Sequence, residues 1–341
     1  MHAGLILVAA IWPFWGRSTE FDVSDGLKDL IPAYQILAQG EGIAERRFRY
    51  RLFVPQPRTP GEKFPLIVWL HGGGESGRDN YRQMYFVEES IFTDTTSAER
   101  YRFAFLAPQC PIDKGWIGAL GDDVNMLDVV MQMADHAIAE HPIDADRITA
   151  VGVSSGGGAC WELANRHPDR FAGIAPLASS PRQGHDLSHL KLVPIWAFFS
   201  PIDEMMSQKA VVQQTQRVRE AGGRVELTFV ADHPSTANKK WTHFCFVEAF
   251  RQYGLLEWLL AQSRAANDDP PPGHLSWQTV FSVGHLWPRC GGYVVLATAG
   301  TVAWAAFRHA KRRRRMNSSA TLGGPVLPPA TGEAHGSIGT S

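Results

Sequence analysis

The chain has 341 residues, of which 33 are Lys or Arg and 34 are Asp or Glu, so its formal net charge is −1. A composition of 44% hydrophobic and 20% charged residues excludes a disordered acidic chain and a basic nucleic-acid-binding protein. The four scattered cysteines exclude a disulfide-rich scaffold. The sequence has no Cys-x-x-Cys pair of the kind that marks a zinc site.

The N-terminal segment, residues 1–19, contains an uncharged apolar run from Ala3 to Trp15. This run is too short to cross a bilayer and resembles the apolar part of a signal peptide. No Lys or Arg precedes it and no clear cleavage site follows it, so a plain buried or surface helix is the alternative. We expect an export signal.

Residues 20–262 alternate between strand and helix patterns. Short β-branched or aromatic runs predict strands at 47–55, 65–71, 103–108, 147–153, 171–178, 193–200 and 225–230. Apolar residues at helical spacing predict helices over 122–140, 156–167, 208–221 and 245–262. Strands that are apolar on both faces and separated by helices predict one α/β domain, with a mostly parallel sheet and helices on both faces.

The C-terminal region predicts a membrane anchor. Asp268–Pro272 give residues 263–275 the composition of a linker, and a transmembrane region is predicted over 276–310. Its apolar core has 17 uncharged residues and directly precedes a basic cluster, which opens a tail over 311–341 that we expect to be disordered. Because positive charges next to a membrane span tend to stay on the cytoplasmic side, the basic cluster favours a cytoplasmic tail and an extracytoplasmic domain. A buried core helix is the alternative, but the segment lacks a polar face.

A candidate nucleophile lies where a predicted strand meets a predicted helix. The sequence there is Gly152-Val153-Ser154-Ser155-Gly156. In a Gly-x-Ser-x-Gly elbow, a sharp turn exposes the serine hydroxyl, and a Cβ at either glycine would collide with the neighbouring strand and helix. Ser154 is therefore the predicted nucleophile; an ordinary serine in a glycine-rich turn is the alternative.

A second glycine-rich turn, His71-Gly72-Gly73-Gly74, follows the strand predicted at 65–71. Acyl transfer needs N–H donors aimed at the oxyanion, and glycine lets the backbone approach that atom. We expect the donors to be the N–H of Ser155 and that of Gly72 or Gly73. His71 is expected to orient this loop. Trp116 is a candidate for the substrate cleft, with core packing as the alternative.

An acid and a base should follow the serine in the chain. Asp203 lies just after the strand predicted at 193–200, and Asp186 and Asp232 are weaker candidates. Two histidines, His233 and His243, follow the last predicted strand, and position alone leaves both open.

Several segments resemble a known family: LHGGGESGRDN at 70–80, FLAPQCP at 105–111, and the stretches at 141–179, 194–206 and 243–262. They are similar, in order, to the esterase/peptidase branch of the α/β-hydrolases, described as phospholipase/carboxylesterase-like or polyhydroxybutyrate-depolymerase-like. The resemblance implies an α/β-hydrolase fold with Ser154 as nucleophile, Asp203 as acid and His243 as base. It departs from the family at Ser200-Pro201, where a glycine is usual, at Phe246, where a Trp is usual, and in an extra stretch, Pro234–Lys240, between the last strand and the histidine.

Residues and resemblance together predict a serine hydrolase that cleaves carboxylic esters through an acyl-enzyme, without a metal or organic cofactor. The short connection between 171–178 and Asp203 leaves no room for a long lid, so we expect short-chain or exposed polymeric esters as substrates. A serine peptidase of the same fold and a non-catalytic binding module are the alternatives. Cys110 and Cys245 are expected near the pocket, as two thiols or as a disulfide.

Overall fold

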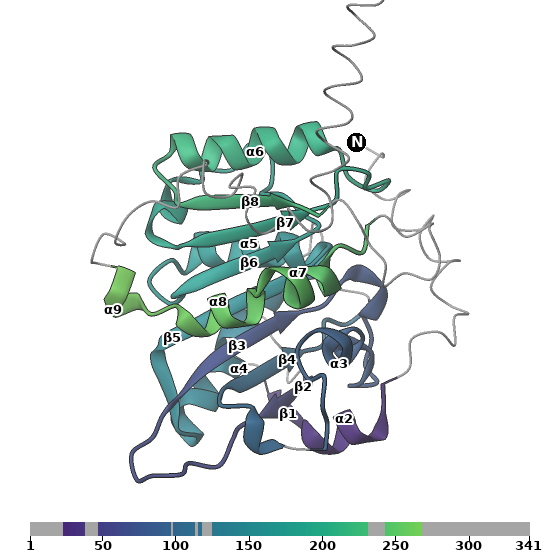
Figure 1. Cartoon of the computed structure of the whole chain (residues 1–341), viewed down its shortest axis with the longest axis vertical. Helices are drawn as coiled ribbons and strands as arrows, with labels where there is room; N and C mark the ends of the chain where they lie inside the picture. Colours follow the sequence, from purple (N-terminus) through teal and green to yellow (C-terminus); the bar gives the residue numbers. More distant parts are fainter. Residues whose placement is uncertain are drawn as a thin grey trace, which may run out of the picture. The chain divides into compact units, whose positions relative to one another are not determined.

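The computed structural model of the chain describes residues 23–37, 47–96, 98–112, 115–117, 125–230 and 243–267 (Figure 1). The predicted export signal, the transmembrane region and the tail lie outside these residues. Within the described ranges, no helix has the length and apolar character that crossing a membrane would require.

One eight-stranded sheet organises the described residues (Figure 1). Its strand order is β1-β2-β4-β3-β5-β6-β7-β8. The strands are β1 (Ala33–Leu37), β2 (Arg47–Phe53), β3 (Phe64–Leu70), β4 (Ala104–Pro108), β5 (Ile143–Val153), β6 (Gly173–Leu177), β7 (Ile195–Phe199) and β8 (Val225–Phe229). The pairs β1–β2 and β2–β4 are antiparallel and the other pairs are parallel, which confirms the mostly parallel sheet.

Helices cover both faces of the sheet. They are α2 (Asp25–Leu30), α3 (Val87–Ser90), α4 (Met126–Glu140), α5 (Ser155–Arg166), α6 (Gln208–Glu220), α7 (Phe246–Tyr253), α8 (Leu255–Ala261) and α9 (Arg264–Asn267), with 3₁₀ turns η1 (Gly73–Glu75), η2 (Arg82–Met84), η3 (Ala98–Arg100) and η4 (Ser188–Leu192). Apolar residues of α4, α5 and α6 form one buried cluster with the sheet, and those of α2, α3, α7 and α8 form another. Every residue of β3, β4 and β6 is buried, as strands covered on both faces require.

The observed elements differ from the prediction at several places, among them the short helix α3, which is not predicted. The sequence patterns do not predict α2 and β1, which precede the strand predicted at 47–55. The helix predicted over 245–262 is two helices, because Gly254 between α7 and α8 has a left-handed backbone with φ 69°. Helix α9 falls within the predicted linker 263–275, whose last residues lie outside the described ranges.

The carboxyl ends of the parallel strands lie at one edge of the sheet, where open α/β sheets bind their ligands. The loops after β3, β5 and β7 carry the Gly72-Gly73 turn, Ser154 and Asp203. The fold therefore places segments that are far apart in the sequence at this common edge.

Candidate active site

Ser154 occupies a strained turn between β5 and α5. Its backbone angles are φ 55° and ψ −115°, a conformation that is rare for a residue with a side chain. A Cβ on Gly152 would lie 2.1 Å from the carbonyl oxygen of Gly156, and one on Gly156 would lie 2.0 Å from that of Leu70. Only glycine fits at either position, so the Gly-x-Ser-x-Gly spacing follows from the tightness of the turn.

Two backbone hydrogen bonds hold the strained residue in place. The N–H of Ser154 donates to the carbonyl of Leu177 in β6 at 2.9 Å, and its carbonyl accepts from Gly158 at 3.0 Å. Ser154 thus lies at the N-terminus of α5, where the unpaired N–H groups favour negative charge. Such an environment suits a hydroxyl that must become an alkoxide.

Asp203 and His243 form a hydrogen-bonded pair. The carboxyl oxygen Oδ2 of Asp203 lies 2.7 Å from Nδ1 of His243. The other oxygen accepts from the backbone N–H groups of Met205, at 2.7 Å, and Met206, at 3.0 Å. The Asp203 side chain is fully buried and that of His243 nearly so. With both carboxyl oxygens occupied, Asp203 can hold the imidazole in one orientation with the proton on Nδ1.

The other ring nitrogen of His243, Nε2, is buried and has no hydrogen-bond partner in the described part of the chain. No hydrogen bond joins it to the Ser154 hydroxyl there, a bond that often forms only when substrate is present. The alternative base His233 lies outside the described residues, as does Asp232. Asp186 instead accepts a hydrogen bond from the N–H of Ser188 at the start of η4.

The Gly72-Gly73 turn packs directly against the serine elbow. A Cβ built on Gly72 would lie 3.7 Å from the Cβ of Ser154, and one built on Gly73 would lie 3.6 Å from the Ser155 hydroxyl oxygen. The three residues expected to form the oxyanion hole, Gly72, Gly73 and Ser155, are therefore neighbours in space.

His71 is buried, and both of its ring nitrogens are hydrogen-bonded to the backbone. Its Nδ1 lies 2.6 Å from the carbonyl oxygen of Gly72, and its Nε2 accepts a hydrogen bond from the N–H of Cys110 at 2.9 Å. Burial lowers the pKa of His71 to about 4, so the ring is neutral and Nδ1 donates. Both nitrogens are engaged in holding the backbone, which is the orienting role expected for this residue.

Trp116 packs against His71 from the other side. Its indole N–H donates to the carbonyl of His71 at 3.0 Å, and the two ring centroids are 4.7 Å apart. Only 3% of Trp116 is exposed, and it belongs to one of the two buried clusters. Contact between this residue and a substrate stays a prediction.

Glu75, within the glycine-rich motif, is a feature that sequence reasoning left without a role. It is 3% exposed, and burial raises the pKa of its carboxyl group to about 7. The only signal in the sequence is an acidic residue directly after three glycines. Gln109 fixes the same loop, since its side chain donates to the carbonyl of Glu75 at 3.3 Å and accepts from the N–H of Asn80 at 2.6 Å.

The cysteines near the site are buried free thiols. Cys110 and Cys245 are both unbridged, so the two-thiol alternative holds for this pair. Burial, with a smaller contribution from Asp203, raises the pKa of the Cys245 thiol to about 12. This sulfur is therefore a poor nucleophile at neutral pH. The described ranges contain no group of three His, Cys, Asp or Glu arranged to hold a metal ion.

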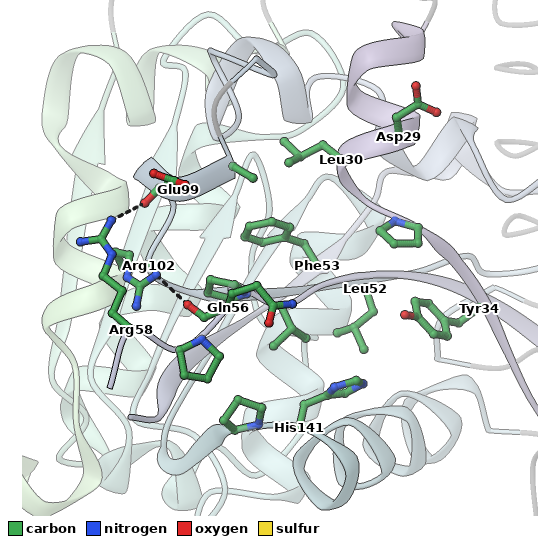
Figure 2. Close-up of a pocket in the computed structure, with 16 residues that line it drawn as sticks. Asp29, Leu30, Tyr34, Leu52, Phe53, Gln56, Arg58, Glu99, Arg102 and His141 are labelled. Atoms are coloured by element: carbon green, nitrogen blue, oxygen red, sulfur yellow. Dashed lines mark hydrogen bonds between the residues drawn. The ribbon is translucent and has the colours of Figure 1, made fainter. Parts of the chain in front are cut away.

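A pocket lies at the opposite edge of the sheet (Figure 2). Its walls come from the end of α2 and the start of β1, from the end of β2, from the segment before β4 and from His141 and Pro142 before β5. Because β2 runs antiparallel to β4, these segments meet at the amino ends of the parallel strands. None of the candidate catalytic residues lines this pocket.

Comparison with known proteins gives partial matches. The chain is 27% identical to "Putative esterase NocK" of Nocardia uniformis subsp. tsuyamanensis over 172 residues, which cover 48% of this chain and 47% of the relative. It is 40% identical to poly(3-hydroxyalkanoate) depolymerase C of Paucimonas lemoignei over 141 residues, which cover 38% of this chain and 31% of the relative. The chain thus spans less than half the length of these curated relatives.

A solved structure described as a thermostable esterase matches with a TM-score of 0.59 and 27% identity, over 69% of this chain and 64% of the other. No family model matches the chain. These similarities support an α/β-hydrolase fold of the esterase branch for this chain.

Proposed function

We propose that the chain is a serine hydrolase that cleaves carboxylic esters through an acyl-enzyme, with Ser154 as nucleophile, His243 as base and Asp203 as acid. The observation that carries this proposal is the 2.7 Å hydrogen bond between Asp203 and His243. Asp203 lies in the loop that follows β7, and Ser154 follows β5 at the same edge of the sheet. The unpartnered Nε2 of His243 supports the role of that nitrogen as proton acceptor.

In the first half of the reaction, Nε2 of His243 takes the hydroxyl proton of Ser154 while the serine oxygen attacks the ester carbonyl. The tetrahedral intermediate collapses as the same nitrogen gives the proton to the departing alcohol. In the second half, water attacks the acyl-enzyme with His243 again as base, and the acid leaves. Asp203 stabilises the imidazolium in both halves.

The N–H of Ser155 and that of Gly72 or Gly73 would hold the oxyanion. The strained turn and the close packing of the two loops fix these donors before the substrate arrives, so no reorganisation is needed at the moment of reaction. Loss of one such donor costs about 3–4 kcal/mol of barrier.

Labelling with a fluorophosphonate probe and hydrolysis of p-nitrophenyl acetate test this proposal together. We expect wild-type protein to be labelled and active, and Ser154→Ala to be neither. Ser188→Ala, on η4, is the matched serine control and should behave as wild type. Equal activity of Ser154→Ala and wild type would refute the proposal, and an unlabelled, inactive wild type would favour a binding module.

The substrates we propose are short-chain or exposed polymeric esters. Ile202 and Met205, on either side of Asp203, are 57% and 47% exposed, which gives the site an apolar rim. The relative from Paucimonas lemoignei is named a depolymerase of a polyester. Hydrolysis of acetyl and butyryl esters and of poly(3-hydroxybutyrate) is the expected result. Activity on emulsified long-chain lipids alone, or on peptide anilides alone, would contradict it.

We further propose that the domain is held outside the cytoplasm by the segment at 291–307, on the basis of its 17 uncharged residues and the basic cluster that follows. A reporter that is active only in the periplasm, fused after Gln262, should be active. An inactive fusion, together with activity of a reporter that works only in the cytoplasm fused at the same position, would place the domain inside.

A further inference from the structure

Glu75 is a buried carboxyl group without a charge partner. It ends η1 and is as buried as the core, and no Lys, Arg or His in the described ranges forms an ion pair with it. Its oxygen Oε1 has no hydrogen-bond partner within those ranges. Burying such a group costs free energy, so the position of Glu75 calls for a compensating role.

The other oxygen of Glu75, Oε2, lies against Gly72. A Cβ on Gly72 would be 2.7 Å from Oε2, while on the elbow side the same Cβ would be 3.6 Å from the Val153 carbonyl and 3.7 Å from the Ser154 Cβ. The carboxyl group of Glu75 and the nucleophile Ser154 therefore both lie close to Gly72.

The neighbouring backbone of Glu75 and of Gly72 lowers the pKa of this carboxyl group and so partly opposes the effect of burial. A carboxyl oxygen that accepts from the N–H of Gly72 removes this donor from the oxyanion hole. The N–H groups of Gly73 and Ser155 belong to the first residues of η1 and α5, where no acceptor exists inside the helix. These two N–H groups remain for the substrate.

We propose that Glu75 is a positioning residue: its carboxyl group holds the Gly72 peptide so that the N–H of Gly73, with that of Ser155, faces the carbonyl oxygen of the substrate. This inference rests on the proposed function and goes beyond it, because it chooses Gly73 over Gly72 and adds a side chain behind the loop. Gln109 supports the arrangement, because its side-chain amide donates a hydrogen bond to the backbone carbonyl of Glu75.

Three variants test the proposal on the full chain with p-nitrophenyl acetate. Glu75→Ala removes the acceptor, and we expect kcat to fall about 30–100-fold with KM within about twofold, below the loss of a whole donor. Glu75→Asp withdraws the carboxyl group by one methylene and should show the same loss. Glu75→Gln retains an oxygen that can accept from Gly72, and its kcat should stay within about fivefold of wild type.

Affinity for a phenylboronic acid, which forms a tetrahedral adduct with the serine, separates positioning from general destabilisation. It should fall in Glu75→Ala and Glu75→Asp by the same factor as kcat. Glu248→Ala on α7, an equally buried glutamate that bonds Gln252, is the matched control. It should lower the melting temperature without changing kcat or boronate affinity. If Glu75→Ala does not fold, the Asp variant carries the same comparison.

Unchanged kcat and boronate affinity in Glu75→Ala or Glu75→Asp would overturn the proposal, and so would equal losses in the Gln and Asp variants. These outcomes are distinct from failure of the proposed function. If Ser154→Ala is as active as wild type, both proposals fall; if Ser154→Ala is inactive while the Glu75 variants are unaffected, only the role of Glu75 is wrong.

Discussion

The two buried histidines at this edge of the sheet, His71 and His243, differ in what their second nitrogen does. His71 has both ring nitrogens engaged, with Gly72 and Cys110, and its ring packs at a tilt against Trp116. His243 is bonded only at Nδ1, to Asp203, and its Nε2 has no partner in the described part of the chain. Burial of an imidazole therefore does not make a base. A carboxylate on one nitrogen and an unoccupied second nitrogen are what distinguish the candidate base from the structural histidine.

Replacing His243 should have the largest effect. His243→Ala removes the proton acceptor, and we expect kcat to fall by at least ~10⁴-fold, because members of a triad act as a unit. Stability should change little beyond the loss of one buried hydrogen bond. Steady-state assays of p-nitrophenyl acetate hydrolysis measure the fall in kcat. Retention of a tenth of the activity would show that another group takes the proton.

Asp203→Asn sharpens the comparison because it changes only the partner of Nδ1. An amide can present its N–H₂ group to the ring and favour the wrong tautomer, so we expect kcat to fall about 10³–10⁴-fold with KM nearly unchanged. A variant with wild-type kcat would mean that Asp203 only shapes its own turn through Met205 and Met206.

His71→Ala should act mainly on stability. It leaves the N–H of Cys110 and the carbonyl of Gly72 without their buried partners, and it opens a cavity beside Trp116. We expect a loss of about 3–4 kcal/mol in the free energy of unfolding and a fall in kcat of about tenfold. Urea denaturation at pH 8 measures the first. A 10⁴-fold loss of kcat with unchanged stability would make His71 a second base and remove the contrast with His243.

Local patterns were sufficient to predict the strands and helices of the central fold. The β-branched or aromatic runs that predict strands correspond to β2 to β8, and among them β3, β4 and β6, which are covered on both faces, are buried throughout. The pair α2 and β1 lacks this signal: β1 lies at the sheet edge and its Tyr34 is exposed, so burial imposes no pattern. The break at Gly254 depends on a single left-handed residue inside an otherwise helical pattern.

The candidate site, like the fold, has residues that the sequence predicts and residues that it does not. The places of Ser154, Asp203 and the Gly72-Gly73 turn follow from the ends of predicted strands, and the choice of His243 needed the family resemblance. The geometry pairs His243 with Asp203, whereas its rival His233 lies outside the described residues. The burial of Glu75 could not be predicted, because a short polar loop carries no periodicity and an acidic residue is usually exposed.

The smallest expected effect concerns the pH dependence of stability. In the wild-type chain, the contributions of His71 and Glu75, which lie in one loop, nearly cancel. The pKa of His71 is about 4 in the folded chain against an ordinary 6.5, so between these values the unfolded chain binds more protons and stability rises with pH. The pKa of Glu75 is about 7 against an ordinary 4.5, so in its window the folded chain binds more protons and stability falls as pH rises. Both groups are fully buried, and over the shared window the two slopes oppose each other.

Removing one group should reveal the slope of the other. Relative to wild type, Glu75→Gln should gain about 3 kcal/mol in the free energy of unfolding between pH 4 and pH 8, since 2.5 pKa units correspond to about that amount. His71→Ala should show the mirror image and lose relative stability over the same range. Urea denaturation at several pH values measures both differences. A difference between Glu75→Gln and wild type that stays constant with pH would mean that the Glu75 carboxyl group keeps its ordinary proton affinity in the loop, because the contacts with Gly72 fully offset the effect of burial.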